Sequence, residues 1–348
     1  MANKRIAFIL GSMGQGGAEK VISVLSRDYA GLGWDTDIIV LLDNRVSYDL
    51  HPNTRIIDFS GNTPSRIKRL PIWVKKLNSY VKTNRPDILL SFTARINIIT
   101  FFACRKDVKK LYVSERNDPR YDGRSKLVDI FTKILYPRTN GVIFQTEYVK
   151  SYFSKIKNSC VIPNPIYIET KASKKRENRI VSVGSLKNQK NHKLLIESFM
   201  EIKDEFPEYT LTIYGEGALR NDLEYQIEKN NLTGRVFLPG GKKNVHEYIS
   251  DAKLFVLSST YEGLSNALLE ALAMGIACIS TDCAGASEYI DGMNGMVVPI
   301  KDKIELSNAI RKMLNDDNYR KMCEKNAIIT SFKFDYNQVL NKWHGFMD

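Results

Sequence analysis

Short apolar runs alternate with longer amphipathic stretches from one end of the chain to the other. Several of these runs are almost continuously apolar, which is typical of parallel strands buried on both faces. In the first half we predict strands at Ile6–Leu10, Asp37–Leu42, Arg55–Phe59, Asp87–Phe92, Lys110–Ser114, Gly141–Phe144 and Ser159–Ile162. The intervening stretches predict helices at Ala18–Gly31, Ser65–Lys82, Lys126–Tyr136 and Tyr148–Ser154. This alternation indicates a doubly wound α/β fold.

The alternation breaks at Pro163-Asn164-Pro165 and in the polar segment behind it, then restarts. The restart is seen in a strand at Arg179–Val183, a helix at Lys193–Phe206 and a strand at Thr210–Tyr214. A length of 348 residues fits two domains better than one core. We therefore predict a first Rossmann-like domain over 1–165, a linker over 166–178, a second domain over 179–330 and a C-terminal helix within 331–348. A return of that helix to the first domain is one option.

Composition narrows the class of protein. Apolar residues make up 43% of the chain and charged residues 26%, as in a folded globular protein. The five cysteines lack CxxC spacing, which favours free thiols, and the four histidines lack metal-ligand spacing. No apolar run has membrane-spanning length and no signal peptide is recognised, so we expect a cytoplasmic protein. The net charge of +12 favours anionic partners: nucleotide diphosphates, nucleic acid or an anionic membrane face.

The most specific chemistry lies between Glu262 and Glu270, where a loop joins the strand-like Lys253–Ser258 to a helix over Asn266–Met274. At such a loop, backbone amides and the positive end of the helix dipole favour an anion. Helical residues spaced like these two glutamates are roughly 12 Å apart along the axis, about the reach of a nucleotide sugar. We expect one carboxylate to bind ribose and the other a sugar, with the diphosphate between them. A solvated position at the helix start is the alternative for each.

A glycine loop, Gly14–Gly17, follows the first strand. It lacks the dinucleotide fingerprint because Met13 and Glu19 stand where glycines belong, which disfavours a hydride-transfer enzyme. Gly16 and Gly17 still let the backbone approach a phosphate or sugar closely. A tight turn that binds no ligand is the alternative.

Four motifs together resemble the retaining GT-B glycosyltransferases of family 4, along nearly the whole chain. They are Gly16-Gly17-Ala18-Glu19, Pro163-Asn164-Pro165, the pair Glu262 and Glu270, and Gly275 to Asp282 with Asn294-Gly295. The resemblance implies two Rossmann-like doubly wound domains that face a cleft. It also implies that Glu262 contacts the donor sugar, that Gly263, Leu264 and Ser265 meet the diphosphate and sugar through their amides, with Asn266 beside them, and that Glu270 binds the ribose.

The same resemblance assigns the loop after Arg179–Val183 to the donor diphosphate. Lys190 matches the family's lysine. Ser185 stands where an arginine is common, so one phosphate contact departs from the pattern, and Lys187 is a candidate replacement.

Glu115 and Arg116 follow the predicted strand Lys110–Ser114, where many members of the family carry a histidine. A subset of bacterial polysaccharide enzymes resembles this chain there. Arg116 is a candidate to hold a phosphate or an acceptor hydroxyl, with Glu115 orienting it. A structural ion pair between the two is the alternative.

Asp35-Thr36-Asp37 has the form of the metal-binding DxD motif of other glycosyltransferases. It comes directly after Gly31–Trp34, in an ordinary helix-to-strand turn. The resembled family holds its diphosphate by a helix terminus and basic side chains. We therefore expect neither a metal ion nor any other cofactor.

The predicted helix around Arg66 to Lys82 has an apolar face that includes Trp73 and Leu77, flanked by lysines and arginines. A basic amphipathic helix of this kind can lie on an anionic bilayer. A core-facing helix with a solvated back has the same pattern. Both interpretations remain open.

These features predict a retaining hexosyl- or N-acetylhexosaminyltransferase. The donor is expected to be a nucleoside-diphosphate sugar, first of all a UDP-sugar. The acceptor is expected to be a glycan hydroxyl, on a lipid carrier, in the biosynthesis of a surface polysaccharide such as capsule or O-antigen. Because no residue is placed as a nucleophile, we expect same-face attack in which the leaving phosphate deprotonates the acceptor. Peripheral contact with the inner face of the plasma membrane is an option.

Two other functions are weighed against this one. A nucleotide-sugar epimerase of the same architecture would rearrange the donor without an acceptor. A non-catalytic nucleic-acid binder would use the basic surface, but the chain lacks a basic stripe interleaved with aromatic residues. We therefore expect no nucleic-acid partner.

Overall fold

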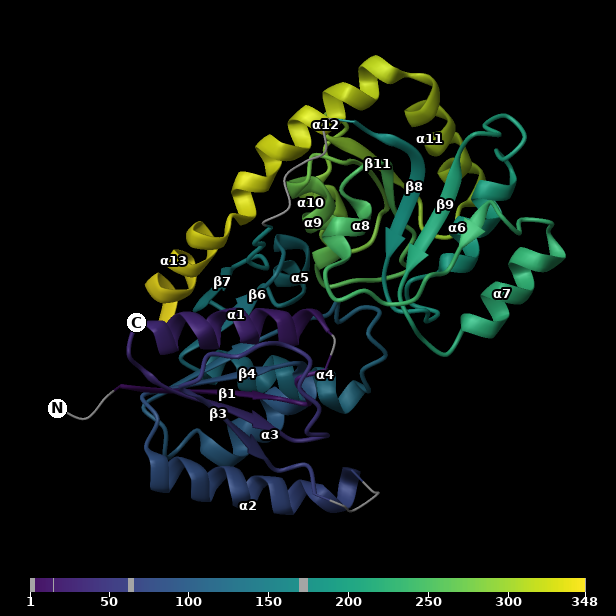
Figure 1. Cartoon of the computed structure of the whole chain (residues 1–348). Helices are drawn as coiled ribbons and strands as arrows, with labels where there is room; N and C mark the ends of the chain where they lie inside the picture. The colour runs from purple at the N-terminus through teal and green to yellow at the C-terminus, as the bar shows by residue number, and fades with distance from the viewer. Residues whose placement is uncertain (1–3, 15, 62–65, 169–174, 348) are drawn as a thin grey trace. The chain divides into compact units, whose positions relative to one another are not determined.

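The computed structural model describes residues 4–14, 16–61, 66–168 and 175–347 (Figure 1). The chain forms two compact units, Met1–Pro165 with Asn337–Asp348, and Ile166–Tyr336. The polar segment predicted as a linker contains residues 169–174, which lie outside the described residues. Each unit is organised around its own parallel β-sheet.

The first unit contains a seven-stranded sheet in the order β3-β2-β1-β4-β5-β6-β7, and every pair of neighbouring strands is parallel. Its strands are β1 (Arg5–Leu10), β2 (Asp35–Val40), β3 (Thr54–Asp58), β4 (Ile88–Phe92), β5 (Lys110–Ser114), β6 (Gly141–Phe144) and β7 (Ser159–Val161). Its helices are α1 (Gly17–Gly31), α2 (Arg66–Asn84), α3 (Ala94–Cys104), α4 (Lys126–Leu135) and α5 (Glu147–Tyr152), with the 3-10 turn η1 (Tyr136–Arg138). The strand order reverses between β1 and β4, as in a doubly wound sheet.

The second unit contains a six-stranded parallel sheet in the order β10-β9-β8-β11-β12-β13. Its strands are β8 (Glu177–Val183), β9 (Thr210–Tyr214), β10 (Val236–Phe237), β11 (Ala252–Leu257), β12 (Ala277–Thr281) and β13 (Gly295–Val298). Its helices are α6 (His192–Met200), α7 (Arg220–Lys229), α8 (Val245–Ile249), α9 (Asn266–Ala273), α10 (Ala286–Tyr289), α11 (Lys303–Asn315) and α12 (Asp317–Ser331), followed by the 3-10 turn η2 (Phe332–Phe334). The chain thus contains two units of the same α/β architecture.

The last helix, α13 (Tyr336–Met347), packs on the first unit. Lys110 Nζ donates a hydrogen bond to the carbonyl of Met347 over 3.0 Å. His344 Nε2 lies 2.6 Å from Asp28 Oδ2. The C-terminal segment therefore contributes to the unit that begins at the N-terminus.

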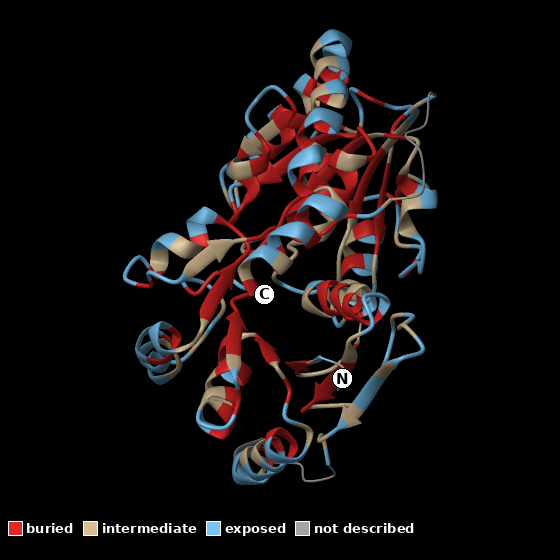
Figure 2. Ribbon diagram, turned by 90° about the vertical axis from the view of Figure 1, so that its left-hand side faces the viewer, coloured by how far each residue is buried: buried red, intermediate tan, exposed pale blue. Residues whose placement is uncertain are grey.

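Most strands form the buried layer of their unit, whereas the edge strand β3 is largely exposed and the helices keep an exposed side (Figure 2). The apolar face of α2 belongs to the core of the first unit: Trp73 and Leu77 are 3% and 0% exposed, and the Trp73 indole donates to the carbonyl of Phe59 over 3.0 Å. Of the two interpretations of α2, the core-facing one is therefore observed. None of the helices in the described residues is long and apolar enough to span a bilayer.

Candidate functional site

Lys190 and Glu262 form a shielded ion pair in the second unit. The Lys190 Nζ atom lies 2.5 Å from Glu262 Oε1, and the two side chains are only 16% and 9% exposed. Ser259 Oγ donates to the same carboxylate oxygen over 2.7 Å. Glu262 belongs to the loop between β11 and α9, and Lys190 belongs to the loop between β8 and α6. The carboxyl ends of two neighbouring strands thus bring together residues 72 positions apart.

Backbone packing determines where Lys190 lies. A Cβ atom at Gly184 would stand 3.0–3.2 Å from the aliphatic stem of Lys190, so a side chain here would press that stem out of place. A Cβ atom at Gly215 would lie only 1.9 Å from the carbonyl oxygen of Gly184, which keeps the next loop tight against the first. Ser258 Oγ donates to the Lys190 carbonyl over 2.9 Å, tying this loop to the end of β11.

The helix α9 begins beside this pair. Ser265 is its N-cap, and the Ser265 hydroxyl accepts a hydrogen bond from the amide of Leu268 over 3.4 Å. The positive end of the α9 dipole therefore lies at the loop that carries Glu262, where it favours an anion. Gly263 and Leu264 are buried in this loop, and Asn266 opens the helix.

Glu270 lies farther along α9 and is 6% exposed. His246 of α8 approaches it, with Nε2 3.2 Å from Glu270 Oε2 but without hydrogen-bond geometry. His246 was not predicted as a site residue, because its neighbours form no recognisable motif. The second unit thus holds both proposed donor-binding glutamates, and a basic side chain accompanies each.

Ser185 and Lys187 differ in their surroundings. Ser185 is half-buried and Lys187 is exposed, and the Lys187 amide donates to the Ser185 carbonyl over 2.8 Å.

Cys283 is buried next to the ion pair, where desolvation and the charge of Glu262 raise the pKa of its thiol to about 12. The sulfur is therefore a neutral packing group.

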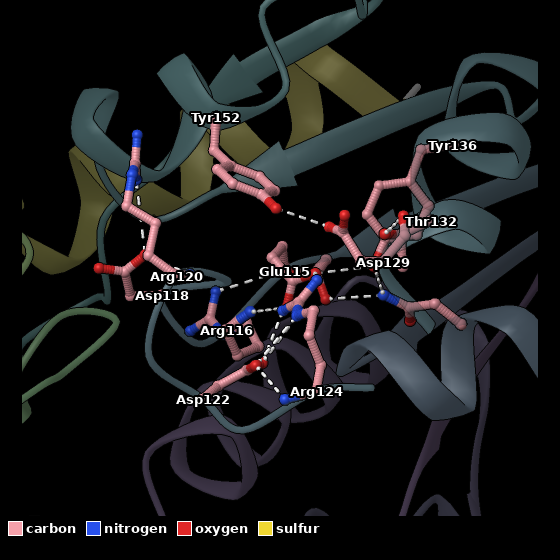
Figure 3. A network of polar contacts seen from close by, with 12 residues as sticks. Glu115, Arg116, Asp118, Arg120, Asp122, Arg124, Asp129, Thr132, Tyr136 and Tyr152 are labelled. Carbon is pink, nitrogen blue, oxygen red and sulfur yellow. Dashed lines mark hydrogen bonds and ion pairs between the residues drawn. The ribbon is translucent and has the colours of Figure 1, made fainter. Parts of the chain in front are cut away.

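In the first unit, the Glu115 carboxylate is paired with side chains other than the Arg116 guanidinium, and only the backbone amide of Arg116 reaches it, over 3.3 Å. The Arg124 guanidinium lies 3.2 Å from Glu115 Oε1, and the Tyr136 hydroxyl donates to Glu115 Oε2 over 2.9 Å (Figure 3). Arg124 also binds Asp122 over 2.6 Å. Burial raises the pKa of Glu115, and the charge of Arg124 opposes that shift. Glu115 is thus part of a buried network that joins the end of β5 to the η1 turn.

Arg116 is a buried cation whose hydrogen-bond acceptors are neutral. Its Nη2 donates to Asn164 Oδ1 over 2.5 Å, its Nη1 donates to Ser114 Oγ over 3.3 Å, and its guanidinium stands 5.4 Å from the centre of the Phe92 ring. Among the described residues, no carboxylate lies within ion-pair distance of it, and its Nε has no hydrogen-bond partner. Burial lowers the pKa of Arg116 to about 9, which still leaves it charged at neutral pH.

The two residues therefore differ in role. Glu115 is paired with a cation within the protein, whereas the Arg116 guanidinium keeps a buried positive charge that only neutral groups accept hydrogen bonds from. Asn164, from the Pro163-Asn164-Pro165 motif, orients the Arg116 guanidinium. The motif that ends the first unit thus also supplies a hydrogen-bond acceptor for Arg116.

The glycine loop supplies a second carboxylate near Arg116. Gly16 is the N-cap of α1, and the Glu19 side chain folds over it so closely that a Cβ at Gly16 would lie 2.2 Å from Glu19 Oε2. Gly17 is the first residue of the helix. Burial raises the pKa of Glu19, and the charge of Arg116 opposes the shift. Glu19 was not predicted as a site residue, yet its carboxylate, in the first turn of α1, lies against the Gly16 backbone.

The aspartates of the DxD-like motif are engaged by arginines. Asp35 lies 2.7 Å from Arg5, and Asp37 lies 2.7 Å from Arg55 and also accepts from the Tyr80 hydroxyl. Asp37 is fully buried. Both carboxylates therefore have a structural role in the first sheet. No cluster of metal ligands occurs within the part of the chain that the structure describes.

Two family models match the chain, one in each unit. The model described as "Glycosyltransferase Family 4" matches residues 15–170. The model described as "Glycosyl transferases group 1" matches residues 164–330.

Curated relatives match over almost their whole length. One is the N-acetylgalactosamine-N,N'-diacetylbacillosaminyl-diphospho-undecaprenol 4-alpha-N-acetylgalactosaminyltransferase of Campylobacter jejuni, 28% identical over 95% of this chain and 96% of that protein. Another protein of the same organism, named as a GalNAc-alpha-(1->4)-GalNAc-alpha-(1->3)-diNAcBac-PP-undecaprenol alpha-1,4-N-acetyl-D-galactosaminyltransferase, is 25% identical over 97% of each chain.

Solved structures share the fold. TarM from S. aureus, crystallised as a mutant with Fondaparinux, alpha-GlcNAc-glycerol and UDP, superposes with a TM-score of 0.83 at 15% identity, over 99% of this chain and 100% of the other. HepE from Anabaena, crystallised with UDP and glucose, has a TM-score of 0.83 at 17% identity over 99% of both chains.

The fold, the two family matches and the relatives define the class: this chain is a glycosyltransferase with the GT-B fold. The predicted fold class is thereby confirmed, and so is the transferase activity in its general form. The curated relatives named above act, by their names, on glycans carried by diphospho-undecaprenol.

Proposed function

We propose that this protein is a retaining glycosyltransferase that moves an N-acetylhexosamine or hexose from a UDP-sugar to a hydroxyl of a lipid-linked glycan. The observation that carries the proposal is the pairing of Lys190 with Glu262 at the start of α9, with Glu270 farther along the same helix. This arrangement offers a cation and a helix terminus to a diphosphate. It also offers a carboxylate on either side for the hydroxyls of sugar and ribose.

In the proposed reaction, the bond between the anomeric carbon and the diphosphate oxygen breaks, and its electron pair remains on the phosphate. The acceptor hydroxyl forms the new bond on the same face, and its proton passes to the departing phosphate. Lys190 and the first turn of α9 stabilise the negative charge that develops there. No covalent intermediate and no metal ion are required in this scheme.

Glu262 has two functions in this proposal. Without donor, it neutralises Lys190 and keeps that lysine within its loop. With donor, Lys190 turns toward the phosphates, and the Glu262 carboxylate becomes available for sugar hydroxyls. The Ser259 hydroxyl, which donates to Glu262, holds the carboxylate in place during that exchange.

The choice of substrates rests on the proteins that are similar to this chain. HepE and TarM were crystallised with UDP, which supports a UDP-sugar donor. The Campylobacter jejuni relatives are named as N-acetylgalactosaminyltransferases with acceptors on diphospho-undecaprenol. On that basis we propose an acceptor carried by a polyprenyl diphosphate. Arg116 is the side chain of the first unit with the charge to meet its diphosphate or a reacting phosphate.

A panel of nucleotides and nucleotide sugars tests the proposal directly. UDP and one UDP-sugar should raise the melting temperature, because a ligand that binds only the folded state stabilises it. That UDP-sugar should then give a labelled product with a polyprenyl-linked glycan, and NMR of the new linkage should show the α configuration. Release of a rearranged free sugar nucleotide without acceptor would identify an epimerase instead. Inversion at the anomeric carbon would reject the retaining mechanism.

A further inference from the structure

The helix α4 turns its apolar stripe outward. Leu127, Ile130, Phe131 and Ile134 recur at three- and four-residue spacing on one side of the helix. They are 66%, 50%, 39% and 45% exposed. A helix on the surface of a globular protein normally buries such a stripe.

The inward side of α4 contains the buried Leu135, which is 6% exposed, together with polar groups. Thr132 is fully buried there, and its hydroxyl donates to the Asp129 carbonyl over 2.8 Å. The Tyr152 hydroxyl of α5 donates to Asp129 Oδ1 over 2.8 Å (Figure 3). The buried Thr132 and Leu135 and the hydrogen bond from Tyr152 therefore mark the inward side of α4, and the apolar stripe lies on the other side.

Phe102 of α3 extends the exposed stripe. It is 58% exposed, and its ring lies edge-on to Phe131 with 5.9 Å between the ring centres. We call the five residues together the α4 face: Phe102, Leu127, Ile130, Phe131 and Ile134. Contiguous exposed apolar side chains of this size mark an interaction surface.

Basic side chains border the α4 face. Lys126 is exposed at the start of the helix, whereas the ammonium of Lys133 is paired with Asp129 and adds no net charge. At the far end, Arg105 Nε donates to the Arg138 carbonyl over 2.8 Å, and Arg138 donates to the carbonyl of Ile134. The single acidic residue of α4, Asp129, is engaged by Tyr152 and Lys133. The border is therefore positive.

We propose that the α4 face docks the first unit on an anionic bilayer surface. Its apolar side chains would enter the boundary between headgroups and acyl chains, and the bordering lysines and arginines would face the anionic phosphates. A second copy of the chain is the less suitable occupant, because a two-fold contact brings like-charged borders together. The proposal does not depend on the sugar or the acceptor, and it places the contact on α4 instead of α2.

Vesicle sedimentation of the full chain tests the proposal. Wild-type protein should sediment with mixed phosphatidylcholine–phosphatidylglycerol vesicles and much less with phosphatidylcholine alone. The triple variant Leu127→Gln/Ile130→Gln/Ile134→Gln should bind the mixed vesicles at least about a hundredfold more weakly, because the apolar contribution is lost while glutamine preserves the helix. Lys126→Ala should weaken binding at 0.1 M salt and have little effect at 1 M, where the Debye length falls from about 10 Å to about 3 Å.

Matched controls separate the α4 face from apolar exposure in general. Leu32→Gln/Ile304→Gln/Ile329→Gln removes three side chains that are 61%, 66% and 57% exposed elsewhere, and it should bind vesicles like the wild type. Lys75→Ala/Lys82→Ala, on the exposed side of α2, should do the same. Circular dichroism and the UDP-induced shift in melting temperature check that every variant folds.

Three results would overturn the proposal: wild-type protein that ignores the mixed vesicles, a triple variant that binds them as tightly as the wild type, or a control triple that loses binding equally. A wild-type dimer that the α4 triple variant converts to a monomer, without vesicle binding, would assign the face to a second copy. None of these results depends on catalysis, so loss of vesicle binding and failure of the proposed reaction are distinguishable.

Discussion

Lys190 and Glu262 are joined to each other by a 2.5 Å contact, although each is proposed to bind a different part of the same ligand. The pair is shielded, so neither charge is left without a partner before the donor arrives. A diphosphate brings more negative charge to Lys190 than Glu262 alone supplies. Donor binding should therefore exchange one partner of Lys190 for another.

We expect Lys190→Ala and Glu262→Ala each to lower kcat/KM by at least about a hundredfold, or about 2.7 kcal/mol of transition-state stabilisation. Lys190→Ala should also lower the free energy of unfolding by about 1–3 kcal/mol, because the Glu262 carboxylate stays buried without its cation. The double variant should be more stable than the sum of the single effects predicts. Transfer assays and thermal unfolding give both quantities.

Lys193→Ala is the matched control, since Lys193 lies near the same loop but its side chain is 71% exposed. It should keep wild-type turnover and stability. Turnover near the wild-type level in both Lys190→Ala and Glu262→Ala would contradict the assigned site.

Arg116 and Glu115 should respond to substitution in opposite ways. Arg116→Met removes a buried cation that lacks a carboxylate partner among the described residues, so we expect unchanged or higher stability and a loss of activity of at least about tenfold. Glu115→Gln removes the negative charge that pairs with Arg124 and should lower the free energy of unfolding by about 1–3 kcal/mol. Comparing melting temperature with turnover in the two variants separates the roles. A fully active Arg116→Met variant would assign Arg116 to structure alone.

Much of the fold could be predicted because buried parallel strands have a strong apolar signal. All seven predicted strands of the first unit exist, and Lys110–Ser114 and Gly141–Phe144 have the predicted bounds. The strand β2 begins two residues earlier than predicted, at Asp35. Aspartate disfavours a strand, but the Arg5 guanidinium of β1 lies 2.7 Å from the Asp35 carboxylate, and no local pattern reveals such a partner.

Other features depended on contacts that are distant in sequence. The helix α3 was not predicted, because its apolar residues lack a polar side. The helix α6 ends at Met200, six residues earlier than predicted, where a series of turns replaces it. The outward stripe of α4 could not be predicted, because periodicity identifies an apolar face without showing which way it points.

The site was predictable to the extent that motifs specify it. Glu262, Glu270 and Lys190 were selected from spacing and resemblance, and the second unit contains all three. The contact between Lys190 and Glu262, and the separation of Glu115 from Arg116, arise from side-chain packing. These are relations between segments distant in sequence, and no local residue pattern encodes them.

Two glycines near the ion pair should separate effects on the site from effects on folding. Gly184→Ala places a Cβ against the flexible stem of Lys190, so we expect a folded protein with turnover reduced about tenfold and little change in melting temperature. Gly215→Ala places a Cβ 1.9 Å from the backbone oxygen of Gly184, which cannot move as a side chain can. This variant should lose about 2 kcal/mol or more of stability. Equal effects of both substitutions on turnover and melting temperature would contradict this view of the loop.

His192 should make the protein sensitive to acid. Its imidazole begins α6 and is 3% exposed, with Nε2 3.3 Å from the Gly184 carbonyl. Burial lowers the pKa of His192 from its ordinary 6.5 to about 4, so the folded state holds a neutral ring. Between these values the unfolded chain binds the proton and the folded chain does not.

Stability contributed by the neutral His192 ring should therefore be present above pH 6.5 and be lost as the pH falls from about 6.5 to about 4. The loss should reach about 3 kcal/mol, since one pKa unit corresponds to 1.36 kcal/mol. His192→Asn removes the titrating group, so the difference in unfolding free energy between variant and wild type should change across this window and stay level above it. Urea unfolding at a series of pH values measures that difference. A difference that stays constant from pH 4 to pH 7 would mean that the ring accepts its proton in the folded protein as easily as in the unfolded chain.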